Sequence, residues 1–102
     1  MRIANEDEFD KIFSIMMESF PIDEYRTYEE QKALLDNPKY AIYVVPDAKS
    51  ENVKAFITVW QFEDFAFVEH FTVNSVYRNQ GLGSQMLREI LGMVSCRLCL
   101  EV

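Results

Sequence analysis

The sequence predicts one small α+β domain over residues 1–102, in which a β-sheet is covered by helices. Two observations predict this class. Some segments carry apolar residues at helical spacing, and others are rich in β-forming residues and are separated by turn signals. Their order is strand, two helices, three strands, helix and a last strand. With 49% hydrophobic and 14% aromatic residues, the 102-residue chain has the composition of a folded domain.

The first part of the chain predicts a short strand followed by two helices. Residues 1–4 fit an edge strand, and Asn5 fits the N-cap of a helix. The apolar residues of that helix recur at helical spacing: Phe9, Ile12, Phe13, Met16 and Phe20. Thr27 and Glu30 form the pattern of a capping box for a second helix, which Asn37-Pro38 ends.

The second part predicts a three-stranded meander, a helix and a last strand. The meander strands are residues 40–45, 53–62 and 65–73, with polar turns between them. The last strand covers residues 97–101. Apolar residues on one stripe predict the helix between them: Leu82, Met86, Leu87, Ile90, Leu91 and Val94.

The chain is acidic, with 17 acidic residues, 10 basic residues and a net charge of −7. This balance disfavours nucleic acid and anionic membrane surfaces as partners and favours a cationic one. The N-terminal segment has no apolar signal core, and no apolar run is long enough to span a bilayer. We therefore expect a cytoplasmic protein.

Two cysteines, Cys96 and Cys99, have Cys-x-x-Cys spacing within an apolar run. Strand alternation would point them to opposite faces, and the chain has only one histidine to complete a metal site. We expect buried, reduced thiols and no metal. A redox pair or half of a metal site is the alternative.

A loop with two glycines, Arg78-Asn79-Gln80-Gly81-Leu82-Gly83-Ser84, joins the third meander strand to the next helix. Backbone N–H groups at a helix N-terminus lack intrahelical partners, and the helix dipole favours an anion there. Arg78 can add a positive charge. The loop lacks the lysine of a P-loop, and Met86 occupies the place of the third small residue of a dinucleotide fingerprint.

The remaining pattern, Arg78-x-x-Gly81-x-Gly83 after a strand ending Glu69-His70-Phe71-Thr72-Val73, resembles motif A of the GNAT family of N-acetyltransferases. Tyr77 and the helix that follows fit the same motif. The resemblance implies that the loop holds the pyrophosphate of acetyl-CoA and that the pantetheine arm pairs with the strand. The implied binding residues are Phe71, Thr72, Val73, Arg78, Asn79, Gln80, Gly81, Leu82, Gly83 and Ser84.

The order of elements is also similar to the first two-thirds of the GNAT fold. The resemblance implies a mostly antiparallel sheet whose last two strands, residues 65–74 and 97–101, run parallel and splay apart. Family members continue with a helix, which often donates a tyrosine as general acid, and two more strands. The chain ends before these elements, and we expect a homodimer that covers the last strand and the third helix.

Alternation along residues 65–73 predicts that Glu69 shares a face with Phe67, Phe71 and Val73, opposite His70. Aromatic neighbours would desolvate the Glu69 carboxyl and raise its pKa, and the resemblance favours it as the general base. The alternative is a solvated carboxylate at the mouth of the sheet. We expect His70 to be a packed or hydrogen-bonded core residue. A backbone N–H near Val73 would hold the thioester oxygen, as in the family.

These features favour an enzyme that transfers an acetyl group from acetyl-CoA to an amine in one ternary complex. A non-catalytic acyl-CoA-binding or assembly module with the same core is the alternative, and an unrelated scaffold with an ordinary glycine turn is a third interpretation. The loop over residues 20–25 lines the acceptor pocket in relatives. Its Asp23 and Glu24 would attract an ammonium group, or they form an ordinary solvated loop.

Overall fold

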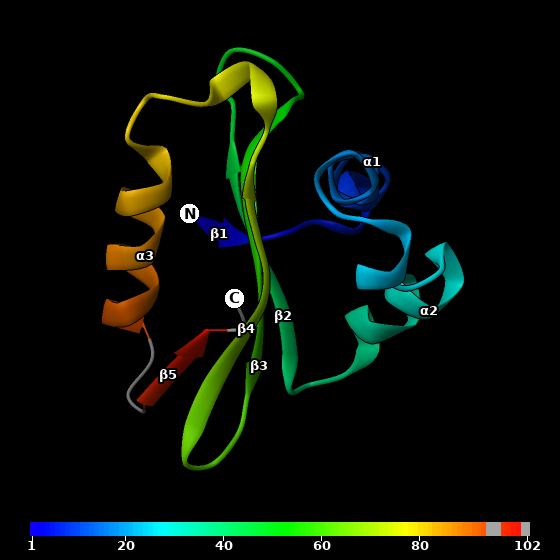
Figure 1. Cartoon of the computed structure of the whole chain (residues 1–102), viewed down its shortest axis with the longest axis vertical. Helices are drawn as coiled ribbons and strands as arrows, with labels where there is room; N and C mark the ends of the chain where they lie inside the picture. Colours follow the sequence, from blue (N-terminus) through cyan, green and yellow to red (C-terminus); the bar gives the residue numbers. More distant parts are fainter. Residues whose placement is uncertain (94–96, 101–102) are drawn as a thin grey trace.

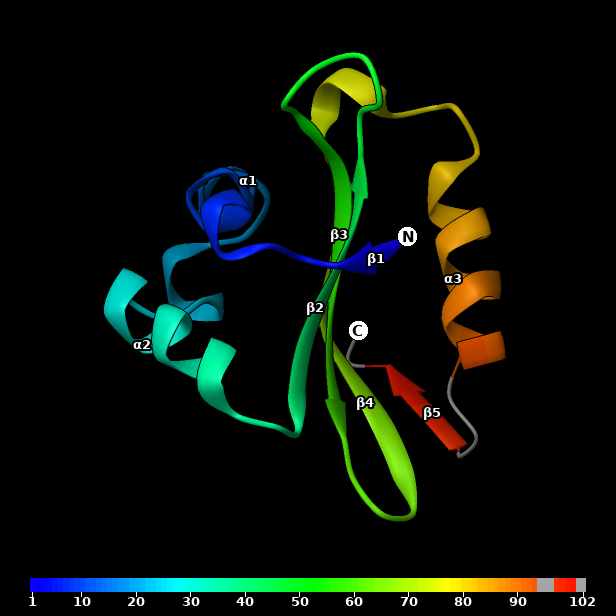
Figure 2. The ribbon, with the colours of Figure 1, turned by 180° about the vertical axis from the view of Figure 1, so that it is seen from behind.

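The computed structural model describes residues 1–93 and 97–100, which form a sheet with helices on both faces. Helix α3 covers one face, and α1 and α2 cover the other (Figures 1 and 2). The strands follow one another across the sheet in sequence order: β1 (Arg2–Ile3), β2 (Tyr40–Pro46), β3 (Val53–Gln61), β4 (Phe65–Val73) and β5 (Arg97–Leu100). The predicted order of elements is confirmed.

The helices are α1 (Phe9–Ser19), α2 (Tyr28–Ala33) and α3 (Leu82–Met93). The capping box predicted for α2 is present, with the Glu30 N–H donating to Thr27 Oγ1 at 3.2 Å and the Glu30 carboxylate accepting from the Thr27 N–H at 3.3 Å. Short 3-10 turns flank the helices: η1 (Glu6–Glu8), η2 (Ile22–Glu24), η3 (Leu34–Asp36) and η4 (Ser75–Tyr77).

Strands β1 to β4 are antiparallel, and β5 pairs in parallel with the first four residues of β4. The parallel pairing agrees with the resemblance. The expected splay is not seen among the described residues, because β5 ends at Leu100, opposite Val68. Cys96, Val94 and Glu101 lie outside the described residues, so the predictions made for them are not addressed.

A β-bulge interrupts the pairing of β3 with β4. Thr58 lies opposite His70 and Val59 lies opposite Val68, which leaves Glu69 as the extra residue. An extra residue breaks the alternation of side chains across the sheet. Glu69 and His70 consequently both face α1 and α2, whereas Phe71 packs on the α3 side. The prediction that Glu69 shares a face of the sheet with Phe71 and Val73 is therefore wrong.

Each face of the sheet has its own hydrophobic core. On the α1 side, buried residues of α1 pack on β2 and β3: Phe9, Ile12, Phe13, Ile15, Met16, Tyr40, Ile42, Val44, Val53 and Phe56. On the α3 side, the buried set is Ala55, Ile57, Val59, Ala66, Val68, Met86 and Ile90. Leu91, which we placed on the apolar stripe of α3, is 57% exposed instead.

Among the described residues, no helix has both the length and the apolar character needed to cross a membrane.

We predict that Phe56→Ala lowers the free energy of unfolding by about 3–5 kcal/mol, because Phe56 is 0% exposed in the centre of the sheet. This is a large part of the roughly 5–15 kcal/mol that stabilises a typical domain. Urea unfolding followed by circular dichroism measures the change. The control is Leu91→Ala on the outer side of α3, which should change stability by about 0.5 kcal/mol or less. Equal losses in both variants would contradict this account of the core.

Candidate functional site

The glycine loop reverses the chain between the end of β4 and the start of α3. Asn79 and Gly81 both have positive φ angles, 67° and 72°. Gly81 supplies this left-handed conformation without steric cost, and a Cβ added there would meet no heavy atom within 4 Å. The carbonyl of Gly81 then accepts from the Gln85 N–H at 3.2 Å, in the first turn of α3.

A pocket of about 470 Å³ lies between the end of β4 and the N-terminus of α3. Its lining comprises all the residues that we predicted to bind acetyl-CoA except Gln80, together with Tyr77: Phe71, Thr72, Val73, Tyr77, Arg78, Asn79, Gly81, Leu82, Gly83 and Ser84. A Cβ added at Gly83 would lie 3.7 Å from the Phe71 ring, an ordinary van der Waals contact, so the start of α3 packs on β4 without requiring a glycine there. The end of β4 and the glycine loop thus line one pocket together.

Hydrogen bonds to neighbouring elements hold the loop in place. The Tyr77 hydroxyl donates to Asp47 Oδ2 at 2.7 Å, in the turn between β2 and β3. This bond and the Lys49 N–H hold the pKa of Asp47 below its usual value. Arg78 folds back on β4, with its Nε donating to the Val73 carbonyl at 3.1 Å.

The edge of β4 beside this pocket has backbone groups that do not pair with β3. The Asn74 N–H donates to the Lys54 carbonyl on β3 at 2.8 Å. Because successive residues of a strand direct their backbone groups to opposite sides, the N–H and carbonyl of Val73 face the other edge. Strand β5 pairs only with Phe65–Val68, so within the described residues it does not cover this part of β4.

Glu69 lies outside this pocket and is held by an arginine that the sequence analysis did not single out. Arg26 donates to both carboxylate oxygens, at 2.7 Å to Oε1 and 2.9 Å to Oε2, and the Trp60 indole N–H lies 3.4 Å from Oε1. Burial acts to raise the pKa of Glu69, but the Arg26 hydrogen bonds and positive charge and the Trp60 hydrogen bond outweigh it. The pKa lies below its usual value, so the predicted upward shift is wrong.

The Arg26 guanidinium is itself fixed by buried polar groups. Its NH1 nitrogen lies 3.4 Å from Gln31 Oε1, and the Gln31 amide donates to the Tyr40 hydroxyl at 2.6 Å. Gln31 is 0% exposed, although it belongs to the short helix α2. The polar chain therefore connects β4, the segment before α2, α2 itself and β2.

His70 is a core residue, as predicted, with 5% of its surface exposed. Its Nε2 donates to the Glu24 carbonyl at 2.7 Å, and its ring meets the Phe20 ring edge-on at 4.9 Å between centroids. His70 Nδ1 is buried, has no hydrogen-bond partner within the described part of the chain and lies 3.8 Å from Glu69 Oε1. The histidine thus ties the loop that contains η2 to β4.

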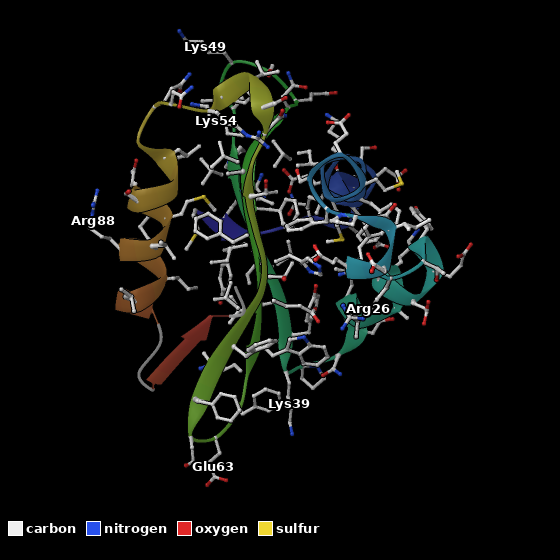
Figure 3. All side chains as sticks on the ribbon, viewed as in Figure 1. Arg26, Lys39, Lys49, Lys54, Glu63 and Arg88 are labelled. Atoms are coloured by element: carbon white, nitrogen blue, oxygen red, sulfur yellow. The ribbon has the colours of Figure 1, made fainter. Side chains whose placement is uncertain are left out.

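The acidic loop between α1 and α2 lies near Glu69 on the same face of the sheet. Asp23 and Glu24 are both exposed there. Arg26, two residues after Glu24 and labelled in Figure 3, is partly buried and pairs with Glu69. One sequence signal could have identified Arg26, which is the only cation in that loop. Pairing it with Glu69, 43 residues later, needed the structure.

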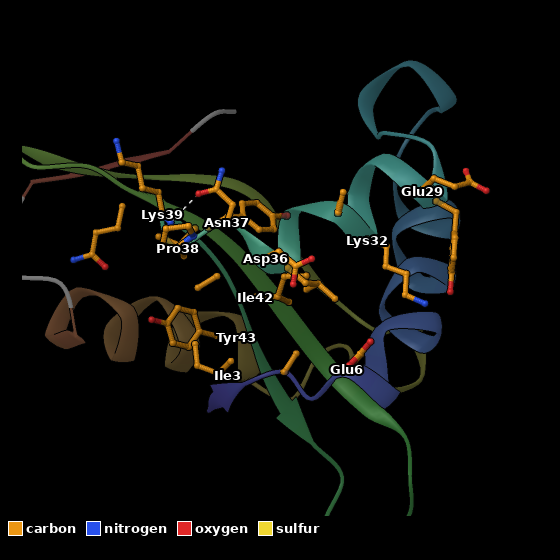
Figure 4. A pocket seen from close by; sticks show the side chains of 18 residues that line it. Ile3, Glu6, Glu29, Lys32, Asp36, Asn37, Pro38, Lys39, Ile42 and Tyr43 are labelled. Atoms are coloured by element: carbon orange, nitrogen blue, oxygen red, sulfur yellow. Dashed lines mark hydrogen bonds between the residues drawn. The ribbon is translucent and has the colours of Figure 1, made fainter.

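A larger hollow, of about 920 Å³, lies along the outer edge of β2, between β1 and the segment from α2 to Lys39 (Figure 4). Its lining mixes acidic side chains with Lys32 and Lys39 and contains none of the predicted site residues. The glycine-loop pocket is smaller, but it is the one with the backbone geometry of an anion site. Among the described residues, no three potential ligands gather in an arrangement that would hold a metal ion.

We predict that the stability difference between the wild type and Glu69→Gln depends on pH. Because the folded pKa of Glu69 is lowered, ionised Glu69 stabilises the fold above the unfolded pKa of about 4.3, and this contribution is lost as pH falls through the folded pKa. Urea unfolding at pH 7, 5, 4 and 3 should show the difference shrinking on acidification. The control, Glu63→Gln, changes an exposed residue in the β3–β4 turn and should stay close to the wild type throughout. A constant difference for Glu69→Gln would contradict the prediction.

Residues 6–101 match the model of the acetyltransferase (GNAT) family. A solved structure from Bacteroides thetaiotaomicron, assigned to the GNAT family, is 30% identical and covers the whole chain with a TM-score of 0.81. The chain spans 58% of that protein. No curated protein sequence matches it significantly.

Two more distant structures share the fold. Arabidopsis thaliana NAA60, in complex with a bisubstrate analogue, is 20% identical with a TM-score of 0.78, and the match covers 99% of this chain and 72% of that one. An aminoglycoside 6'-N-acetyltransferase complexed with coenzyme A is 18% identical with a TM-score of 0.72, over 91% of this chain and 54% of that one. The family match over nearly the whole chain and the similarity to the Bacteroides protein show that the chain belongs to the GNAT acetyltransferase family.

Proposed function

We propose that this protein transfers an acetyl group from acetyl-CoA to an amine acceptor, and that acetyl-CoA binds in the glycine-loop pocket. The observation that carries the proposal is the pocket itself, where an edge of β4 that no described strand covers meets a left-handed glycine turn at the start of α3. An amine is the acceptor class that suits an acidic chain, because an ammonium group is attracted to negative charge. The aminoglycoside 6'-N-acetyltransferase that shares the fold fits this class.

In this proposal the pyrophosphate lies against the backbone N–H groups of residues 78–84. The dipole of the twelve-residue helix α3 favours the anion there. The pantetheine amides pair with the backbone of Phe71–Val73, as another strand would. The Val73 N–H would then donate to the thioester oxygen and stabilise the negative charge that develops on it during attack.

The chemical step is direct attack of the amine nitrogen on the thioester carbon. A new C–N bond forms, the C–S bond breaks, and CoA leaves as a thiolate that takes a proton from solvent or from a neighbouring acid. Glu69 accepts the proton that the amine loses, directly or through a water molecule. Because Arg26 keeps Glu69 ionised, the carboxylate is available as a proton acceptor at neutral pH, although it is a weaker base than we expected.

One observation favours the alternative, a module that binds acyl-CoA without turnover. Arg26 already holds both oxygens of Glu69, and Glu69 is not among the residues that line the pocket. Turnover would require the acceptor nitrogen to reach Glu69 from the α2 side of β4. Homodimer formation, a splayed pair of last strands and a cytoplasmic location remain predictions.

We predict that Gly81→Glu lowers the affinity for CoA at least tenfold, because it adds bulk and negative charge where the phosphates approach the loop. Isothermal titration with CoA measures the change. The matched control is Gly92→Glu, which adds the same charge to an exposed position of α3 away from the pocket. Circular dichroism checks that Gly81→Glu folds, since a φ of +72° strains a glutamate backbone. Unchanged affinity in folded Gly81→Glu would exclude the loop as the CoA site.

We also predict that Glu69→Gln slows acetylation of a good amine acceptor by roughly a hundredfold, because glutamine keeps the shape of the side chain but cannot accept the proton. The rate should recover in part at high pH, where more of the amine is already deprotonated, and CoA affinity should not change. A coupled thiol-release assay across pH 6–10 measures the loss of rate and its partial recovery. Equal rates for the variant and the wild type would exclude this role, and a wild type that binds CoA but releases no thiol would favour the binding module.

A further inference from the structure

We infer that Arg26 is a positioning residue of this site, which fixes the Glu69 carboxylate so that its Oε2 atom receives the proton of the acceptor amine. The inference rests on the proposed function and adds a residue to it. Arg26 comes from the segment just before α2, and Glu69 is the extra residue of the bulge in β4. The two elements are otherwise far apart in the sequence.

The geometry of the pair restricts the carboxylate to one orientation. Arg26 makes two parallel hydrogen bonds, of 2.7 Å and 2.9 Å, to the two Glu69 oxygens. A bidentate arginine fixes the plane of a carboxylate, which a lysine cannot do. The side chains of Arg26 and Glu69 are 31% and 18% exposed, so water competes only in part for these bonds.

The hydrogen-bond partners of the two oxygens are unequal. A carboxylate has about four acceptor positions, two on each oxygen. Among the described residues, Oε1 receives both the Arg26 guanidinium and the Trp60 indole, whereas Oε2 receives only Arg26. The acceptor position that remains on Oε2 can therefore take a proton without displacing Arg26 or Trp60.

The Arg26 guanidinium is also held by the Gln31 side chain. The Gln31 amide is 0% exposed and holds Arg26 at 3.4 Å on one side and the Tyr40 hydroxyl at 2.6 Å on the other. A fully buried amide cannot turn freely, because its polar atoms would lose their partners. Arg26 is consequently fixed from both sides, by Gln31 and by Glu69.

The test compares Arg26→Gln, Arg26→Lys and Arg2→Gln. Arg2 in β1 forms a bidentate pair of similar geometry, at 2.8 and 2.9 Å, with Glu8 in the η1 turn that precedes α1. This control variant therefore loses an equivalent ion pair away from the site. The first measurement is the titration of the Glu69 carboxyl carbon by NMR in isotope-labelled protein, which does not depend on turnover.

We expect the Glu69 titration to move to higher pH in Arg26→Gln, to move less in Arg26→Lys, and to stay at the wild-type position in Arg2→Gln. The turnover number should fall by about tenfold to a hundredfold in Arg26→Gln with little change in KM for acetyl-CoA, and the acid limb of the pH–rate profile should follow the NMR titration. Lysine should restore part of the rate.

An Arg26→Gln protein whose Glu69 titration and pH–rate profile match those of Arg2→Gln would overturn the inference. Where Arg26→Gln does not fold, Arg26→Lys and the wild type carry the test. A wild-type Glu69 that titrates above the ordinary glutamate value of about 4.3 would overturn it as well. A wild type without acetyltransferase activity would count against the proposed function only, because the NMR titration would still show whether Arg26 controls the charge of Glu69.

Discussion

The one-residue bulge at Glu69 is the constraint on which the candidate site depends. Without it, alternation along β4 would direct Glu69 and Phe71 to the same face of the sheet. With it, Glu69 and His70 both face the α1 and α2 layer, and Phe71 is left to pack beside the start of α3. Strand β4 therefore directs polar side chains toward α1 and α2 on one face of the sheet. On the other face, it contributes an apolar wall to the glycine-loop pocket.

The two polar contacts on the α2 side also fix the connection between α1 and α2. The η2 turn is attached to β4 through the Glu24 carbonyl and His70, and the segment before α2 is attached through Arg26 and Glu69. Aromatic residues of this connection also pack on the core, where the Tyr25 and Tyr28 rings meet the Phe13 ring edge-on. Hydrogen bonds and charge therefore add to this packing in fixing the position of the connection relative to β4.

Much of the fold could be predicted from the sequence, because local signals carried it. The capping box at Thr27, the meander strands and the helix after the glycine loop all follow from short-range patterns, and the loop residues that line the pocket follow from a motif. The environment of Glu69 could not be predicted. A bulge has no clear sequence signature, and the Arg26 pair joins residues 43 positions apart, so neither the face nor the charge state of Glu69 could be read from spacing.

Trp60 is the only tryptophan of the chain, and its indole N–H lies 3.4 Å from the carboxylate that Arg26 holds. Indole emission depends on the charge and the hydrogen bonding around the ring. Any event that alters the Glu69–Arg26 pair, whether protonation, a bound cation or movement of the α1–α2 connection, acts directly beside this chromophore. The single tryptophan of the protein thus lies at its candidate site, and the state of that site can be followed by tryptophan fluorescence without any added label.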